Sequence, residues 1–176
     1  MEETLALIDK IIEEHKLIFH RVQTLDSATN DIRAMLELER AKEDFVPRRF
    51  GDQRRALQIW QESIEAVDEG LQAHFDREEK GLLTAFEKYG DRMLASALHV
   101  LLLEHEELRN RFAKLKTEVA ELAVGGLSRE VWEGKAWGVR TYLNHTLKLL
   151  EAHAQSEQEL LETLRSESRR TIKGND

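Results

Sequence analysis

Two copies of one pattern of metal-ligand residue types stand out in this chain. Each copy is a Glu-His pair followed, further along the chain, by His-x-x-x-Glu. Positions four apart lie on one face of an α-helix, so the imidazole and the carboxylate of His-x-x-x-Glu are directed into the same space between helices. Two such half-sites and two single histidines offer four nitrogens and two carboxylates, a set suited to two neighbouring transition-metal ions. The copies are Glu14-His15 with His74-Phe-Asp-Arg-Glu78, and Glu104-His105 with His153-Ala-Gln-Ser-Glu157.

The elements that position these residues are predicted to be helices. Apolar residues recur at steps of three and four, and no stretch alternates with period two, so the fold class is all-α. Pro47 interrupts the pattern after the first helix, and polar residues from Ser27 to Asn30 indicate a bend within it. The predicted helices cover about residues 2–44, 52–89, 91–124 and 128–168.

Helix caps and stops mark most of these boundaries. Short polar side chains accept hydrogen bonds from the first free N–H groups of a helix, which makes Asp52, Asp91 and Ser128 the expected N-terminal caps. Glycine ends helices readily, and Gly90 and Gly125-Gly126 are placed where the second and third helices should stop. The short connections predict antiparallel neighbours and therefore one up-down-up-down four-helix bundle over residues 1–168, followed by a frayed polar tail over 169–176.

The four histidines of the repeated pattern are expected at one level of this bundle. At 1.5 Å per residue, each lies roughly 20 Å from the same end. Each also shares its helical stripe with apolar residues, which indicates that it faces the core. The inward side of the first helix, for example, is predicted to carry Leu5, Ile8, Ile12, Phe19, Val22, Ile32 and Leu36.

A metal site is favoured over simple packing. One core histidine is usually a hydrogen-bonded packing residue, but four at one depth are harder to explain in that way. Glu78 and Glu157 would be costly to bury in an apolar interior unless they were paired or bound a cation. Glu79 could be the inward carboxylate instead of Glu78 if the helix were rotated, but it lies about 140° around the helix from His74.

The remaining histidines and the tryptophans are predicted to have no part in this site. No other histidine has a carboxylate four residues later, so these three are expected to be structural or exposed. The tryptophans are expected to anchor the core or the helix contacts. These residues are His20, His99 and His145, and Trp60, Trp132 and Trp137.

Composition excludes several other classes of protein. The chain has 176 residues, a formal charge of −8 and no cysteine, so disulfides, thiolate catalysis and cysteine-bound clusters are excluded, and a nucleic-acid partner is not expected. The longest apolar run, Val100–Leu103, is far shorter than the roughly 20 residues that cross a bilayer. The N-terminus is acidic and lacks the pattern of a secretory signal, which favours a cytoplasmic location. Nucleotide-binding glycine motifs and nucleophile elbows are also absent.

The sequence resembles the hemerythrin-like, or HHE cation-binding, domain over about 150 residues, from Glu14 to Leu161. The resemblance rests on the Glu-His-x-x-Leu/Ile and His-x-x-x-Glu elements and on their order. Ferritin-type bundles use Glu-x-x-His instead, and no Glu-x-x-His occurs here.

This resemblance implies a di-iron centre. Each iron would have two histidine nitrogens and two bridging carboxylates, with room for an oxo or hydroxo bridge and an exogenous molecule. Zinc is a possible substitute, because it often outcompetes ferrous iron for nitrogen and oxygen ligands. The resemblance assigns His15 and His74 to one iron, His105 and His153 to the other, and Glu78 and Glu157 to both.

The resemblance also indicates a ligand and a group of functions. Oxygen-carrying hemerythrins have a second histidine one turn from the first on their third helix, but this chain has Leu101 and Arg109 at those positions. The four-histidine, two-glutamate set is similar to di-iron proteins that bind or react with O2 or NO for sensing, detoxification or iron handling, including iron–sulfur repair. Reversible oxygen binding or storage stays an alternative, as does a helical interaction module with a structural metal. Enzymatic turnover and oligomeric state are left open.

Overall fold

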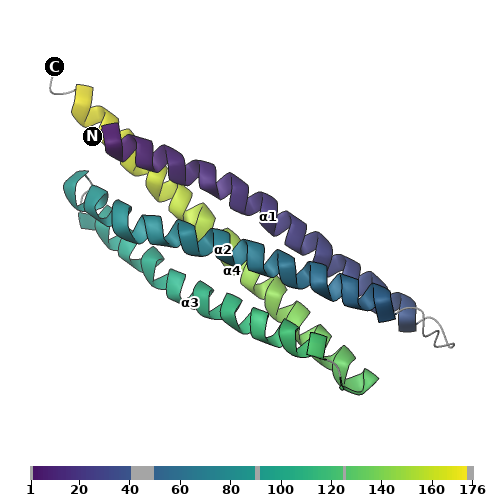
Figure 1. The fold of residues 1–176 in the computed structure, drawn as a ribbon. Coiled ribbons are helices and arrows are strands. Elements are labelled where there is room, and N and C mark those ends of the chain that lie inside the picture. The colour runs from purple at the N-terminus through teal and green to yellow at the C-terminus, as the bar shows by residue number, and fades with distance from the viewer. Residues whose placement is uncertain (1, 41–49, 90–91, 125, 174–176) are drawn as a thin grey trace.

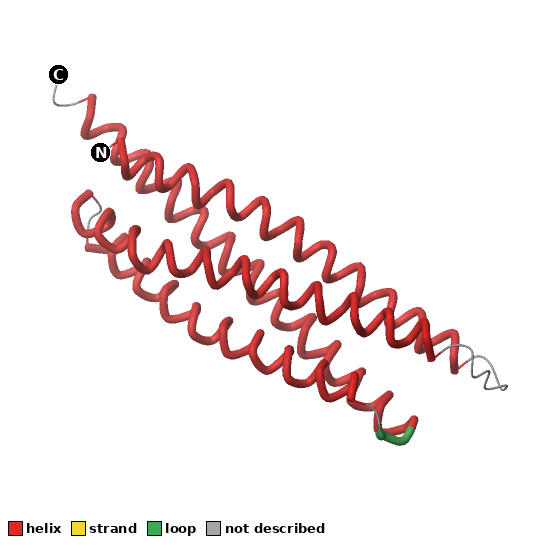
Figure 2. Tube along the Cα trace, in the orientation of Figure 1, coloured by secondary structure: helices red, strands yellow, loops and turns green. Residues whose placement is uncertain are grey.

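A computed structural model of the chain describes residues 2–40, 50–89, 92–124 and 126–173. These residues form four long helices and contain no strand, which confirms the all-α fold class (Figures 1 and 2). None of the described helices has a stretch apolar and long enough to cross a membrane. The helices are α1 (Glu2–Arg40), α2 (Phe50–Tyr89), α3 (Arg92–Val124) and α4 (Arg129–Lys173).

The helices form an antiparallel bundle. Each helix packs against the next one in the chain, and α1 also packs against α4. Figure 1 shows the start of α1 and the end of α4 at one end of the bundle, with the end of α1, the start of α2, the end of α3 and the start of α4 at the other end. The predicted up-down-up-down arrangement is therefore confirmed.

Two predicted helix boundaries are wrong. Helix α2 begins at Phe50, so Asp52 lies within its first turn and is not the N-terminal cap. Helix α4 continues to Lys173 instead of ending near Ser168, because no glycine or proline lies between Ser168 and Gly174. The predicted end of the first helix near residue 44, the stop at Gly90 and the cap at Asp91 lie outside the described residues.

The start of α4 agrees with the prediction. The Ser128 Oγ accepts a hydrogen bond from the Val131 N–H at 3.4 Å, and the Ser128 carbonyl accepts one from the Trp132 N–H at 2.9 Å. Gly126, in the turn before it, has a φ of +83°, which a residue with a side chain rarely adopts. The polar cap and the glycine together set the entry of the chain into α4.

The apolar interior consists of two clusters separated along the bundle axis. On every helix the run of buried apolar residues is interrupted by a buried histidine or glutamate. On α1, for example, His15 lies between Ile11 of one cluster and Ile18 of the other. The larger cluster contains Trp60, whose indole N–H donates to the Thr29 Oγ at 3.0 Å. A layer of buried polar side chains therefore divides the core.

Some predicted core positions are different in the structure. Phe19 is 39% exposed and Trp137 is 43% exposed, so neither is a core anchor. Helix α1 is continuous through Ser27–Asn30, where a bend was predicted, and the Ser27 and Thr29 hydroxyls donate to carbonyls four residues earlier. The side chains predicted inward after Asn30 on this helix, Ile32 and Leu36, lie outside the described part.

Candidate metal centre

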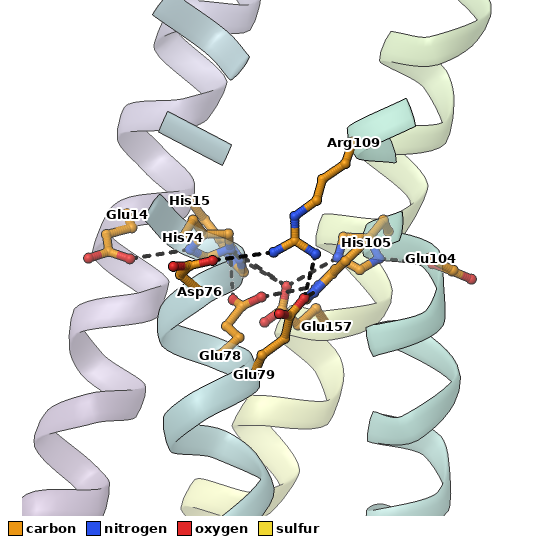
Figure 3. Close-up of polar contacts among 11 residues, drawn as sticks. Glu14, His15, His74, Asp76, Glu78, Glu79, Glu104, His105, Arg109 and Glu157 are labelled. Carbon is orange, nitrogen blue, oxygen red and sulfur yellow. Dashed lines mark hydrogen bonds and ion pairs between the residues drawn. The ribbon is translucent and has the colours of Figure 1, made fainter. Parts of the chain in front are cut away.

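The six predicted ligand residues meet in the polar layer between the two apolar clusters. One histidine comes from each helix, α2 and α4 add one glutamate each, and all six side chains are buried. Figure 3 shows the labelled members converging on a common space inside the bundle. This six-residue cluster consists of His15, His74, Glu78, His105, His153 and Glu157.

One half of the cluster joins α1, α2 and α4. The Nε2 atoms of His15 and His74 are 3.0 Å apart, a usual separation for two ligands of one ion. His15 Nε2 lies 3.2 Å from Glu157 Oε2, and His74 Nε2 lies 2.7 Å from Glu78 Oε1. Ligand atoms of these four residues all lie within 4.8 Å of one another.

The other half joins α2, α3 and α4. Ligand atoms of Glu78, His105 and His153 lie within 4.8 Å of one another. His105 Nε2 is 3.3 Å from Glu78 Oε2, and His153 Nε2 is 3.6 Å from Glu157 Oε2. The two oxygens of Glu78 therefore face histidines of different halves, while Glu157 approaches histidines of both halves through one oxygen.

Several buried atoms of the cluster have no hydrogen-bond partner among the described residues. Apart from the Nδ1 of His15, they are both carboxylate oxygens of Glu78, one oxygen of Glu157 and the Nε2 of His153. Glu78 Oε1 nevertheless lies 2.7 Å from His74 Nε2, an ion-pair contact. Buried polar atoms are normally hydrogen-bonded, and unpaired carboxylate oxygens are especially costly. A cation in contact with these atoms would satisfy them, so the residues fit a metal ion site with nitrogen and oxygen ligands.

The Hemerythrin HHE cation binding domain matches residues 6–164, nearly the whole chain and all six cluster residues. This chain belongs to the hemerythrin family. The family binds small ligands such as O2 at a metal site. No curated protein and no solved structure gave a significant match to the chain.

Three glutamates outside the cluster orient the histidines of this hemerythrin domain. His74 Nδ1 lies 3.2 Å from Glu14, and His153 Nδ1 lies 2.8 Å from Glu104. Because a carboxylate only accepts, each Nδ1–H donates and each Nε2 is turned toward the cluster. The sequence pattern assigned no role to the glutamate of each Glu-His pair. In the structure this glutamate contacts the histidine of the following helix, not the histidine next to it in the sequence.

Glu79 has the same orienting role for His105. It accepts the His105 Nδ1–H at 3.0 Å and the Arg109 Nη1–H at 2.7 Å. Its side chain is 36% exposed, whereas Glu78 is fully buried, so Glu78 is the inward carboxylate, as predicted. A second arginine, Arg77, donates to Glu14 at 2.9 Å. Arginines thus anchor two of the three orienting carboxylates.

His15 has no orienting carboxylate among the described residues. The Nδ1 of His15 is buried and has no hydrogen-bond partner among the described residues. The two halves of the cluster are therefore unequal: His105 and His153 are both oriented by a carboxylate, but in the other half only His74 is. An imidazole without a partner on its outer nitrogen is less restrained in rotation.

Burial and mutual contacts move the pKa values within the cluster in different directions. Burial favours neutral His74, but its contacts with the carboxylates of Glu157 and Glu78 outweigh burial and raise its pKa to about 10. Burial lowers the pKa of His105 to about 4, so this imidazole is neutral. Burial and the nearby Glu157 raise the pKa of Glu78, whereas interactions with Glu78, His15 and His74 overcome burial and lower the pKa of Glu157. Without metal, a proton is therefore held at the position where a cation would bind.

The other three histidines lie outside the cluster, as expected. All three are exposed. His99 Nδ1 bonds to the carbonyl of Ala95 on its own helix, and His145 Nδ1 accepts from Arg111 at 3.2 Å. His20 completes the set, and none of the three belongs to a group that could hold a metal ion within the described residues.

Proposed function

We propose that this hemerythrin-family protein binds two iron ions in the six-residue cluster and uses them to bind or react with a diatomic ligand, O2 or NO. The observation that carries the proposal is the shared position of Glu78. It belongs to two groups of ligand atoms, one on each side, and so can bridge two cations. In this proposal His15 and His74 hold one ion, and His105 and His153 hold the other.

The choice of iron rests on the ligand set. Four imidazoles and two carboxylates suit ferrous and ferric ions, and they provide fewer protein ligands than two six-coordinate ions require. Iron bound there would supply open coordination positions and the electrons for diatomic chemistry. The same set also accepts zinc, which would not provide redox chemistry.

The chain's own residues support this use in two ways. Glu14, Glu79 and Glu104 hold the Nε2 atoms of three histidines toward the centre without metal, so little reorganisation is needed. Phe75 is stacked on His105, with ring centroids 3.9 Å apart, and covers that imidazole with an apolar surface. An apolar cover limits water and thereby strengthens electrostatic interactions at the site.

Reversible oxygen carriage is a weaker proposal. The position one turn after His105 holds Arg109, which is bound to Glu79 and Gln72. The position one turn before it holds Leu101, which is buried and apolar. Neither position offers the additional imidazole of the oxygen carriers. Sensing, detoxification and iron handling therefore remain the preferred roles.

Anaerobic reconstitution with ferrous iron, followed by metal analysis, tests the proposal. We expect close to two irons per chain in the wild type and a loss of at least one iron in His74→Ala and in His153→Ala. His99→Ala is the matched control, because this histidine is exposed and outside the cluster, and it should retain both ions. After oxidation, near-ultraviolet absorption should change on addition of azide or NO. A chain that takes up no iron, or only spectroscopically silent zinc, would contradict the proposal.

A further inference from the structure

A cleft of about 820 Å³ lies between α1 and α4 and reaches the six-residue cluster. Its wall includes His15, His74, His153 and Glu157, but neither His105 nor Glu78. The cleft therefore reaches the cluster mainly from the side of His15, the histidine without an orienting carboxylate. Its exposed lining residues connect this side to solvent.

The face between α2 and α3, on the other side of the bundle, has a bridge across it. Arg109 of α3 donates to Gln72 at 2.9 Å and to Glu79 at 2.7 Å, and lies 3.5 Å from Asp76, all on α2. Its guanidinium also lies over the Phe75 ring, 5.3 Å from the centroid. Figure 3 shows Arg109 extending over this side of the cluster.

The repeated pattern explains why, among the described residues, the α1–α4 face has no bridge of this kind beside the cluster. Arg109 is four residues after His105, and the corresponding position after His15 is Phe19, which cannot donate a hydrogen bond. Gln72 is two residues before His74, and the corresponding position before His153 is Glu151. Phe19 and Glu151 both line the cleft, and α1 packs less extensively against α4 than α2 does against α3.

The size of the cleft exceeds what a diatomic ligand needs. Sites for small organic molecules typically have volumes of about 300–1,000 Å³, whereas one water occupies about 30 Å³ in the liquid. The α1 lining runs from His15 to Asn30, which corresponds to about 22 Å along a helix at 1.5 Å per residue. The cleft is therefore long enough for an extended molecule.

The lining combines an apolar floor with a polar rim. The rim includes Asn144 and Lys148, whose side chains have no hydrogen-bond or ion-pair partner in the part of the chain that the structure describes. Neutral polar groups of Gln23, Ser27 and Asn30 lie on the facing helix. The apolar lining consists of Ile18, Val22, Leu71, Phe75, Leu147 and Leu150.

The charges of the lining select against anions. Asp26, Glu151 and Glu157 are acidic, and Lys148 is the single lysine among the lining residues, with no arginine beside it. In the metal-free protein His74 is cationic and lies 3.8 Å from Glu157, so the charges of these two residues offset each other. An anionic molecule would then approach two further carboxylates and one ammonium group, which is unfavourable. A neutral molecule with a hydrogen-bonding group avoids this repulsion and can still use the free amide of Asn144.

We propose that the α1–α4 cleft binds a neutral amphiphilic organic molecule, with its apolar body on the floor and its hydrogen-bonding group beside Asn144. The bound molecule would lie against the His15 side of the cluster. This deepens the proposed function, because the role of such a molecule at the iron centre rests on that function, whereas its binding to the cleft does not.

Fluorescence titration with 6-propionyl-2-(dimethylamino)naphthalene, a neutral aromatic ketone, tests the proposal on metal-free and iron-loaded full-length protein. We expect one probe per chain, and binding about tenfold weaker or more in Val22→Trp, which fills the floor; tenfold corresponds to about 1.4 kcal/mol. Val100→Trp is the matched control, because Val100 is exposed on α3 and away from the cleft, and its affinity should equal that of the wild type. Ala154→Trp fills the cleft from α4 in case Val22→Trp does not fold, as judged by circular dichroism.

Two further comparisons make the test selective. Asn144→Ala should weaken binding of the ketone severalfold, and the anionic probe 8-anilinonaphthalene-1-sulfonate should bind more weakly than the ketone. Absence of ketone binding to the wild type overturns the proposal, as does equal affinity in folded cleft-filling variants or a preference for the anionic probe. If the ketone binds as expected but the chain takes up no iron, the cleft proposal stands and the di-iron proposal fails. If the chain takes up two irons but does not bind the ketone, the di-iron proposal stands and the cleft proposal fails.

Discussion

Metal uptake by the metal-free protein should release a proton from His74. Contacts with the carboxylates of Glu157 and Glu78 overcome burial and raise the pKa of this imidazole to about 10. At pH 7 the difference of 10 − 7 = 3 units leaves roughly one molecule in 10³ with a neutral, metal-binding imidazole. At about 1.4 kcal/mol per unit, the apparent free energy of metal binding is therefore about 4 kcal/mol weaker at pH 7 than above pH 10.

Isothermal titration calorimetry with Zn²⁺ measures this effect without redox chemistry. The heat of binding, compared in buffers of different ionisation enthalpy, gives the number of protons released. We expect at least one proton per chain at pH 7, and an affinity that rises about tenfold per pH unit between pH 7 and 8 for each proton displaced. His105, with a pKa of about 4, is already neutral and should release none.

Substitution of single histidines identifies the source of the proton. His74→Gln should release about one proton fewer than the wild type, in addition to binding metal more weakly. His99→Gln removes an exposed histidine outside the cluster and should leave the proton count unchanged. If His74→Gln and the wild type released the same number of protons, or if the wild-type affinity did not change between pH 7 and 8, the reasoning from the buried hydrogen bonds would be refuted.

Three other predictions follow from the same contacts. Glu14→Gln, which weakens an orienting hydrogen bond, should lower metal affinity about 10- to 100-fold in competition titrations, whereas Glu13→Gln, on the exposed face beside it, should not. Thr29→Val should lower the free energy of unfolding by about 1–3 kcal/mol in urea, because it leaves the buried Trp60 N–H without an acceptor, and an equal loss in Ser27→Val would contradict this. The raised pKa of His74 stabilises the metal-free fold fully below the unfolded-state pKa of 6.5, and this contribution is lost as the pH rises through 10. The free energy of unfolding from urea titrations should therefore be lower at pH 10 than at pH 7 by on the order of 4 kcal/mol. Equal urea midpoints at the two pH values would count against this prediction.

The polar layer has a consequence for stability as well as for metal binding. It separates two apolar clusters and leaves carboxylate oxygens without a hydrogen bond among the described residues. Such atoms are costly to bury, so the apolar clusters must offset this cost in the metal-free protein. A cation bound to the native state alone would also stabilise it by mass action. Metal binding and folding are therefore expected to be coupled.

The sequence by itself determined the helices, their antiparallel order and the six residues that converge. These features follow from local periodicity: His74 and Glu78 share a face because they are four residues apart, and the lengths of the helices place all four histidines at one level. The cap at Ser128 was predictable for the same reason, since its hydrogen bond spans three residues. Whether the six residues bind iron stays a prediction.

Only the tertiary structure decided how the helices are rotated and how closely they approach one another. It showed that Glu14 of α1 orients His74 of α2, that Phe19 is 39% exposed, and that the cluster is reached from the α1–α4 side. A helical repeat gives the spacing of side chains along one helix, but a contact between helices depends on their relative rotation and separation. Those quantities are set by the packing of all four helices together, and so no single segment of the sequence specifies them.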